Sequence, residues 1–197
     1  PLSKKEQERN EMDIIDIKTK QTLVVKELKT KVDMTKYIEE HNFNFDNVYG
    51  ENSTTEEVYL QTVRPMIEAA FKDKAKVTCF AYGQTGSGKT HTMMGPTNTN
   101  GQVITPGLYL LSGFDLFNFI STPEFQHLKV QISFYEIYCG KLHDLLNDRN
   151  VLSAREDGKG NICINGLQEK PISNLNELMK TIDTGLKSRT VGVTGAN

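Results

Sequence analysis

Apolar and polar residues alternate along much of the first fifty positions, which is the pattern of β-structure. Short β-prone runs at residues 14–17 and 22–25, with polar residues between them, predict a small hairpin. Residues 26–33 alternate in charge and carry no apolar stripe, so we expect an exposed loop or ribbon there. In residues 41–48, Phe43 and Phe45 alternate with polar residues, which predicts a strand with one aromatic face.

A helix, a strand and a glycine-rich loop are predicted next along the chain. Ser53–Glu56 is a capping box, and the apolar positions after it recur at helical spacing, so we expect one amphipathic helix to about Lys72. Residues 77–82 are uncharged and β-prone, as in a strand covered on both faces. Residues 83–90 are glycine-rich, and the helix after them should stop at Gly95-Pro96.

The rest of the chain continues to mix helical and extended patterns. The expected elements are a loop at 97–105, a helix at 108–120, two strands within 128–146 with a turn at 139–141, a strand at 162–164 and a helix at 174–189. Strands and helices interleave, so the predicted fold class is α/β.

Composition excludes several classes of protein. Of 197 residues, 37% are hydrophobic and 24% charged, as in a globular domain, and the net charge of -2 disfavours nucleic acid as a partner. No apolar run approaches the roughly 20 residues of a membrane helix, so no membrane partner is expected. The three cysteines stand singly in strand-like stretches, which predicts buried thiols in the reducing cytoplasm.

The most informative motif is Gly83-Gln84-Thr85-Gly86-Ser87-Gly88-Lys89-Thr90, which fits G-x-x-x-x-G-K-[ST]. Its glycines allow successive backbone N–H groups to turn inward and surround anionic oxygens. Lys89 would reach the β and γ phosphates, and the Thr90 hydroxyl would ligate Mg²⁺. A glycine-rich hairpin turn is the alternative, but the motif arises by chance on the order of once in a hundred such chains, and the flanking strand and helix patterns favour a phosphate loop.

Two stretches resemble the kinesin motor domain. Residues 80–93 resemble the kinesin phosphate-loop signature, and residues 133–146, which contain Ser-Phe-Tyr-Glu-Ile-Tyr, resemble a second kinesin stretch on a central strand. The opening Pro1-Leu2 resembles the end of the kinesin R-x-R-P-L segment. The resemblance implies a P-loop NTPase with the kinesin motor fold, in which helices flank a central mixed β-sheet.

The resemblance also assigns residues to a nucleotide site. It implies that Pro1 and His91 flank the adenine, that Gly83 to Gly88 hold the phosphates, and that ATP or ADP with Mg²⁺ is the cofactor. Without the family, His91 would be interpreted as a surface helix residue. The implied partners are tubulin and microtubules, and the implied location is the cytoplasm and its microtubules, in a spindle or flagella.

Within the kinesins, Lys31-Val32-Asp33 matches the K-V-D motif of the kinesin-13 class, whose members depolymerise microtubule ends. In that class the loop is thought to press on curved tubulin. The residues on either side, at 35–39 and 43–46, also resemble the class. An ordinary charged turn is the alternative interpretation of three residues.

The resemblance implies that residues 1–197 are part of a motor domain and end at the start of switch I, which Asn197 resembles. The residues that sense the γ-phosphate and position water come largely from the two switches in this family, so we do not expect this segment alone to hydrolyse ATP. By resemblance, the strand before the glycine loop has neighbours beyond residue 197, so we expect an unpaired sheet edge and an intact mass above 22.2 kDa. Any dimerisation would involve regions outside this chain.

Three other functions remain open at the level of sequence. A cargo-transporting kinesin would share the same motor but would not shorten filaments. A soluble phosphotransferase could use the phosphate loop on a small metabolite. A tubulin-binding module without enzymatic activity could use the charged loop at 155–160, because the corresponding kinesin loop touches tubulin, although a solvated hairpin tip is equally consistent with that segment.

Overall fold

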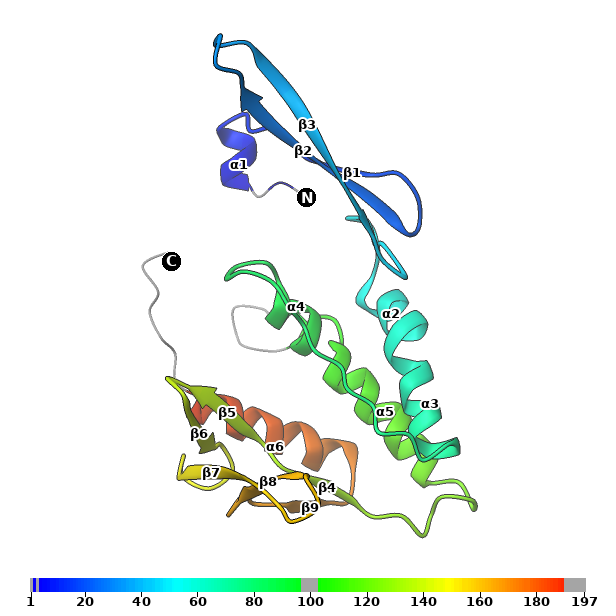
Figure 1. The fold of residues 1–197 in the computed structure, drawn as a ribbon. Coiled ribbons are helices and arrows are strands. Elements are labelled where there is room, and N and C mark those ends of the chain that lie inside the picture. The colour runs from blue at the N-terminus through cyan, green and yellow to red at the C-terminus, as the bar shows by residue number, and fades with distance from the viewer. Residues whose placement is uncertain (1, 3, 97–102, 190–197) are drawn as a thin grey trace. The chain divides into compact units, whose positions relative to one another are not determined.

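Contacts along the chain divide it into two units, Pro1–Thr54 and Thr55–Asn197. The computed structural model describes residue 2 and residues 4–96 and 103–189 (Figure 1). Among those residues, no helix combines the length and the apolar character needed to cross a membrane. The predicted α/β class is confirmed, since strands and helices alternate along the described chain.

The first unit is a three-stranded antiparallel sheet with a short helix before it. Its elements are α1 (Lys4–Glu8), β1 (Ile15–Ile17), β2 (Thr22–Thr30) and β3 (Lys36–Asn44), and the strand order is β1-β2-β3. We call β2 and β3 with their connecting loop the ribbon. It pairs without a break from Thr22 opposite Asn44 to Thr30 opposite Lys36, and Figure 1 shows it as a long twisted hairpin.

The predicted hairpin between β1 and β2 is confirmed, and so is the exposed ribbon that follows it. The aromatic strand expected at 41–48 begins earlier, at Lys36, and ends at Asn44. Pairing with β2 extends the strand backwards, because a charged segment can join a ladder whose two faces are largely exposed. Val24 is the best-buried side chain of the ribbon, at 1% exposure.

The second unit begins with a helical path that changes its pitch. It comprises α2 (Thr55–Val58), a π-helical segment η1 (Tyr59–Val63) and α3 (Arg64–Lys72), so the single amphipathic helix expected here is interrupted. At the junction the Arg64 N–H donates to the Tyr59 carbonyl, five residues back. Pro65 follows directly and has no N–H to continue an α-helical ladder, which accounts for the wide turn before it.

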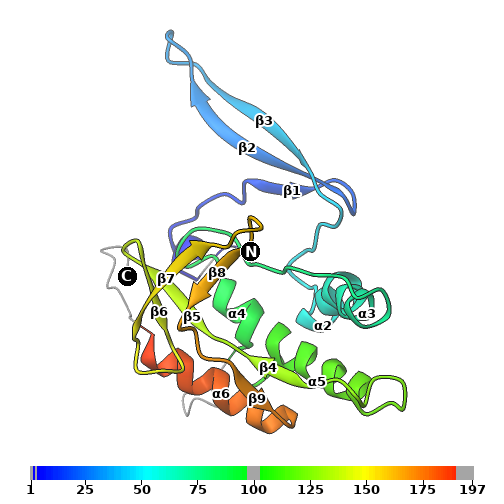
Figure 2. The same cartoon turned by 60° about the horizontal axis from the view of Figure 1, so that its bottom comes forward.

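Helix α5 (Leu108–Ile120) agrees with the predicted bounds and lies beside this helical path (Figure 2). Tyr59, Val63 and Leu108 form the buried centre of a hydrophobic cluster. Its partly buried members are Ile67, Met93 and Leu111. The π-helical segment therefore supplies two of the three central side chains.

The Tyr59 hydroxyl donates a 2.7 Å hydrogen bond to Asp115 Oδ2 on α5. Burial, reinforced by this bond, raises the pKa of Tyr59 far above its usual value of 10.0. Arg64 lies 3.5 Å from the same Asp115 oxygen, so the carboxylate keeps one ionic partner without the phenol.

We expect Tyr59→Phe to lower the free energy of unfolding by about 2 kcal/mol, because it removes a hydrogen bond to a charged acceptor. The neutral phenol is favoured in the folded state, so this contribution is full below pH 10 and declines as pH rises through the folded pKa. Urea unfolding of both proteins measures the difference. Tyr82→Phe is the control, since Tyr82 is 94% exposed. Equal stabilities of wild type and Tyr59→Phe would contradict the prediction.

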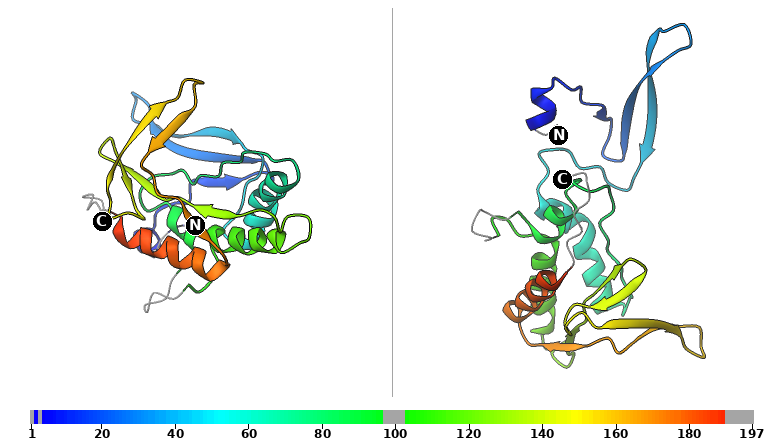
Figure 3. Two further views of the ribbon diagram at one scale, coloured as in Figure 1. Left: turned by 90° about the horizontal axis from the view of Figure 1, so that it is seen from below. Right: turned by 90° about the vertical axis from the view of Figure 1, so that its left-hand side faces the viewer.

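The strands of the second unit form two further antiparallel sheets (Figure 3). One contains β4 (Val130–Ile132) and β9 (Lys170–Ile172); the other runs β5 (Tyr135–Tyr138), β6 (Lys141–Asp144), β7 (Val151–Glu156), β8 (Ile162–Asn165). Three strands, β4, β5 and β6, lie within 128–146, where two were predicted, and the strand predicted at 162–164 is confirmed as β8. Strands β7 and β9 were not predicted. Cys139 and Gly140 make the expected turn, both with positive φ.

Asp144 connects the strands of this region from a fully buried position. Its two carboxylate oxygens accept hydrogen bonds from the N–H groups of Leu146, at 2.9 Å, and Gln168, at 2.8 Å. The predicted helix at the C-terminal end is confirmed as α6 (Leu175–Ser188), and Asn174 caps it by accepting from the Glu177 N–H. A buried carboxylate is thus hydrogen-bonded on both oxygens, as its burial requires.

Two expectations about apolar segments are wrong. Residues 77–82 form no strand with any described residue, and Phe80 and Tyr82 are 79% and 94% exposed. A β-prone run becomes a strand only when a neighbouring strand satisfies its backbone groups, and no described strand lies beside this one. The three cysteines are free, but all are exposed, because one lies in this segment, one in the turn after β5 and one on β8.

Candidate functional site

The glycine loop, Gly83–Gly88, leads directly into helix α4 (Lys89–Met94). Gly86 and Gly88 have φ of 83° and 90°, the left-handed region in which a residue with a Cβ is strained. A Cβ on either residue would meet nothing within 4 Å, so the demand for glycine here is conformational and the loop faces open space. The predicted order of loop and helix is confirmed, as is the helix end at Gly95-Pro96.

Lys89 lies across the mouth of this loop. Its Nζ donates hydrogen bonds to the backbone oxygens of Gly83, at 2.8 Å, and Gln84, at 2.7 Å. The ammonium group is therefore held over the loop at the point where the predicted phosphates would enter. Gly88 caps α4 without any side-chain hydrogen bond, and the first N–H groups of a helix have no acceptor within the helix.

These groups fit the phosphates of a nucleotide with Mg²⁺. Backbone N–H groups at the start of α4 and the Lys89 ammonium are donors and positive charge, and the Thr90 hydroxyl is an oxygen ligand of the kind that Mg²⁺ takes. Thr90 is exposed at the first turn of α4 and open to solvent, as are the loop residues Gln84, Thr85 and Ser87. His91 is also exposed, and its predicted place beside an adenine stays a prediction. Pro1, the other predicted adenine contact, lies outside the described residues.

The second candidate surface is the ribbon tip, the loop Lys31–Thr35 between β2 and β3. The Lys31 N–H donates to the Thr35 oxygen at 2.9 Å, and Met34 adopts a left-handed φ of 67°. Asp33 Oδ1 accepts from the Thr35 N–H at 3.0 Å, and this bond lowers the pKa of Asp33. Asp33 thereby shapes the loop, and the structure places the predicted Lys31-Val32-Asp33 motif at its end.

The other two motif side chains at the ribbon tip point away from the loop backbone. Val32 is fully exposed, and Lys31 lies with its Nζ 5.7 Å from the centre of the Tyr37 ring. This distance permits a cation–π contact. An apolar side chain and a positioned cation therefore stand at the end of the ribbon, available to a partner.

A charged cluster on the ribbon was not predicted from the sequence. Glu27, Glu39 and His41 bring ligand atoms within 4.8 Å of one another, with His41 Nε2 2.9 Å from Glu27. The hydrogen bond with His41 lowers the pKa of Glu27. Lys29 pairs with both glutamates, so the cluster is neutralised by side chains of the ribbon itself. In the sequence, the charged residues of the cluster are two positions apart on each strand. Side chains at that spacing lie on one face of a strand.

The tip of the β7–β8 hairpin, which corresponds to the charged loop at 155–160, is organised by Asp157. Its carboxylate accepts hydrogen bonds from the N–H groups of Lys159 and Asn161 and from the Asn161 amide. The Asn161 amide is the largest cause of the lowered pKa of Asp157. These bonds stabilise the turn itself, so they favour neither a binding role nor a purely structural one.

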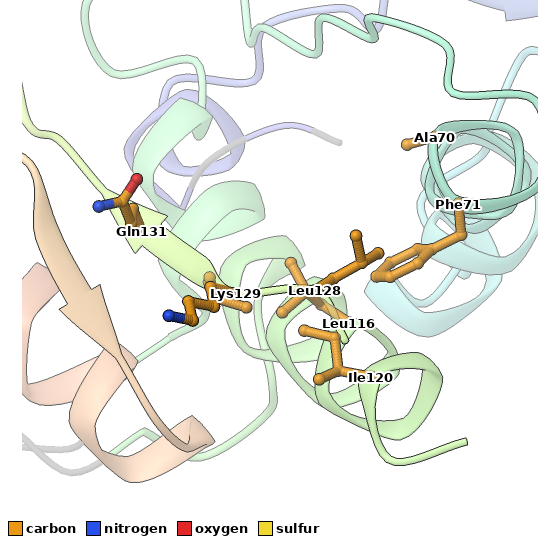
Figure 4. Close-up of a pocket in the computed structure, with 8 residues that line it drawn as sticks. Ala70, Phe71, Leu116, Ile120, Leu128, Lys129 and Gln131 are labelled. Atoms are coloured by element: carbon orange, nitrogen blue, oxygen red, sulfur yellow. The ribbon is translucent and has the colours of Figure 1, made fainter. Parts of the chain in front are cut away.

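An apolar groove of about 340 Å³ lies elsewhere in the second unit (Figure 4). Phe71 of α3 points toward Leu116 and Ile120 of α5 and toward Leu128. Phe71 also stacks on Phe119 at 4.9 Å between ring centres. No residue of the predicted nucleotide site lines this groove, so it has no direct part in phosphate binding.

A glycine loop with left-handed turns, a helix that begins at its end, and a lysine and a threonine in the first turn define a P-loop nucleotide-binding protein. The family model described as "Kinesin motor domain" matches residues 1–197. The chain belongs to the kinesin motor-domain family. Motor domains of this family in general bind a nucleotide with Mg²⁺ and hydrolyse ATP.

Two relatives cover the whole chain. It is 48% identical over 199 residues to "Kinesin-like protein KIF24" of Homo sapiens and 46% identical over 198 residues to "Kinesin-like protein KIF24" of Mus musculus. In both comparisons 100% of this chain is covered but only 14% of the relative. The chain thus spans about a seventh of the length of these relatives.

Proposed function

We propose that this chain is the nucleotide-binding part of an ATP-driven microtubule motor that depolymerises filament ends. The observation that carries the proposal is the geometry of the glycine loop, with Lys89 hydrogen-bonded across its mouth and Thr90 open to solvent beside it. Membership of the kinesin motor-domain family supports the motor function and tubulin as the partner.

Each residue of the site has a separable part in this proposal. Backbone N–H groups of the glycine loop and of the first turn of α4 bind phosphate oxygens. Lys89 exchanges the two carbonyl oxygens that it now contacts for phosphate oxygens and neutralises their charge. Thr90 supplies a hydroxyl to Mg²⁺, and the bound nucleotide supplies the energy of phosphoryl transfer. His91 and Pro1 are assigned to the adenine through the family resemblance.

The depolymerase activity is supported by the ribbon tip. A long hairpin that exposes Val32 and Lys31 at its end can insert them into a concave or curved partner surface, where a flat binding face could not reach. Lys31 adds an exposed positive charge to this contact, held beside the Tyr37 ring. The sequence also left open a cargo-transporting kinesin. Such a motor would use the same nucleotide site without needing this tip.

The proposal is tested by measuring both the ATP turnover of the complete motor and the length of microtubules incubated with it. We expect microtubules to raise the rate of ATP turnover by about 100-fold or more, the size of effect that one positioned hydrogen-bond donor supplies at a reacting centre. Small phosphate acceptors should leave the rate unchanged. Stimulation by a small acceptor and not by microtubules would instead identify a phosphotransferase. Steady filament gliding without loss of the ends would identify a transporting kinesin.

A further inference from the structure

The C-terminal end of α4 lies directly against the start of α5, backbone against backbone. A Cβ built on Gly107 would lie 2.2 Å from the Met94 carbonyl carbon, 2.3 Å from the Gly95 nitrogen and 2.6 Å from the Met93 oxygen. All three atoms belong to the backbone, so no side-chain rotation can make room. The last turn of the phosphate-loop helix therefore rests on a position that has no space for any side chain.

The requirement for glycine at this position is one of space and not of conformation. Gly107 has φ of -85° and ψ of 176°, which any residue adopts. It is also the N-cap of α5, where Ser, Thr, Asp or Asn would stabilise the helix, and it provides no side-chain cap. The chain thus lacks the preferred capping side chain at a place where such a side chain would push α4 away.

Met93 makes a second contact that holds the same end of α4. Its side chain packs against the buried cluster of Tyr59, Val63 and Leu108. Helix α4 has six residues, so its two ends are only about 9 Å apart and a shift at Met93–Gly95 moves Lys89 and Thr90 as well. Thr90 and His91 at the start of α4 are exposed, whereas its far end is held by the packing of Met93 and by the backbone contact at Gly107.

We propose that Gly107, with Met93, is a positioning residue of the nucleotide site: the backbone contact at Gly107 sets the distance of α4 from α5 and so the placement of the phosphate-binding groups. The proposal rests on the function proposed above. A methyl group at this position forces α4 back by roughly 1.2 Å or more to bring the 2.2 Å approach to ordinary contact distance. Displacements of that size at a binding site cost large factors in affinity and rate.

The experiment measures MgADP affinity of the complete motor by titration calorimetry, at a temperature where every variant is folded by circular dichroism. We expect Gly107→Ala to weaken MgADP binding by about tenfold or more. Gly113→Ala is the matched control: it lies on the same helix, and its Cβ would meet the ends of Leu175 and Leu178 at 2.8 and 2.9 Å, on the side of α6. It should lower the melting temperature and leave affinity within twofold of wild type. Gly158→Ala, whose Cβ meets nothing within 4 Å, should change neither.

The outcomes separate the two proposals. Wild-type affinity in Gly107→Ala, or an equal loss in Gly113→Ala, overturns the positioning role while the nucleotide site stands. Failure of the wild type to bind MgADP overturns the proposed function itself. If Gly107→Ala does not fold, Met93→Ala tests the inference instead. This variant adds no atoms at the backbone contact but removes the side chain that packs α4 against the buried cluster. We expect it to bind MgADP about threefold more weakly. Unchanged affinity in Met93→Ala would then refute the inference.

Discussion

In the complete motor, replacement of Lys89 by alanine should abolish measurable ATP turnover and weaken MgADP binding by about 100-fold or more. The substitution removes a side-chain cation that lies over the glycine loop, and a single charged group directed at a phosphoryl centre contributes factors of this size. The folded structure should tolerate the change. Among the described residues, Lys89 donates to the carbonyl oxygens of Gly83 and Gln84, which are exposed and can accept hydrogen bonds from water instead.

Steady-state turnover, MgADP calorimetry and urea unfolding measured on the same preparation check this prediction. Lys187→Ala is the matched control, because it removes an equal charge from an exposed position on α6, where the lysine pairs only with Asp183. The control should keep full turnover, and both variants should unfold within about 0.5 kcal/mol of wild type. Substantial turnover in Lys89→Ala would exclude the glycine loop as the catalytic nucleotide site.

Simultaneous replacement of Lys31, Val32 and Asp33 by alanine should abolish the shortening of microtubule ends and leave basal ATP turnover unchanged. The three residues lie at the ribbon tip in the first unit, whereas the glycine loop lies in the second. No hydrogen bond or ion pair given for the ribbon tip extends beyond the ribbon within the described residues. The loss should therefore be confined to the contact with tubulin.

Single substitutions test whether the loss of shortening comes from a lost contact with tubulin or from a changed shape of the ribbon tip. Val32→Ala removes an exposed apolar side chain and should weaken shortening without altering the loop. Asp33→Asn should keep the hydrogen bond with the Thr35 N–H but lose the charge, so it tests whether that charge is needed by the partner. Lys20→Ala with Gln21→Ala, in the exposed turn between β1 and β2, is the control and should shorten filaments at the wild-type rate.

Filament length by fluorescence microscopy and turnover without microtubules are the two measurements. Shortening that persists in the triple variant would contradict the depolymerase role of the ribbon tip. Loss of basal turnover in the same variant would show that the ribbon acts on the nucleotide site. Filament gliding by the wild type without end loss would favour the transporting alternative.

Local sequence signals were sufficient where the chain's own backbone defines an element. The glycine loop, the bounds of α5 and the helix that became α6 all follow from residues close to each other in the sequence. The same holds for the ribbon tip, because a run of charged residues between two β-prone segments predicts a turn. In these cases the deciding interactions are between near neighbours, which the order of residues already contains.

Elements that depend on distant partners could not be obtained in this way. The apolar run at 77–82 looked like a buried strand, but burial and pairing need a neighbour that periodicity cannot supply. Exposure of Cys79 follows from the same cause, whereas Cys139 lies in the turn after β5 and Cys163 on β8. Pro65 was visible in the sequence as a helix breaker, yet its consequence, the π-helical turn that turns Tyr59 and Val63 into the core, depends on α5 beside it.

From the sequence alone came the chemistry of this protein: a loop able to bind phosphates, a lysine and a threonine in place to act on them, and a motif that resembles a tubulin-binding tip. The tertiary structure alone decided how those groups are held. It brought Glu27, Glu39 and His41 onto one face of the ribbon and placed Gly107 under the end of α4. The physical reason is that a backbone conformation is encoded by adjacent residues, whereas the space available to a Cβ is determined by whichever distant segment packs against it.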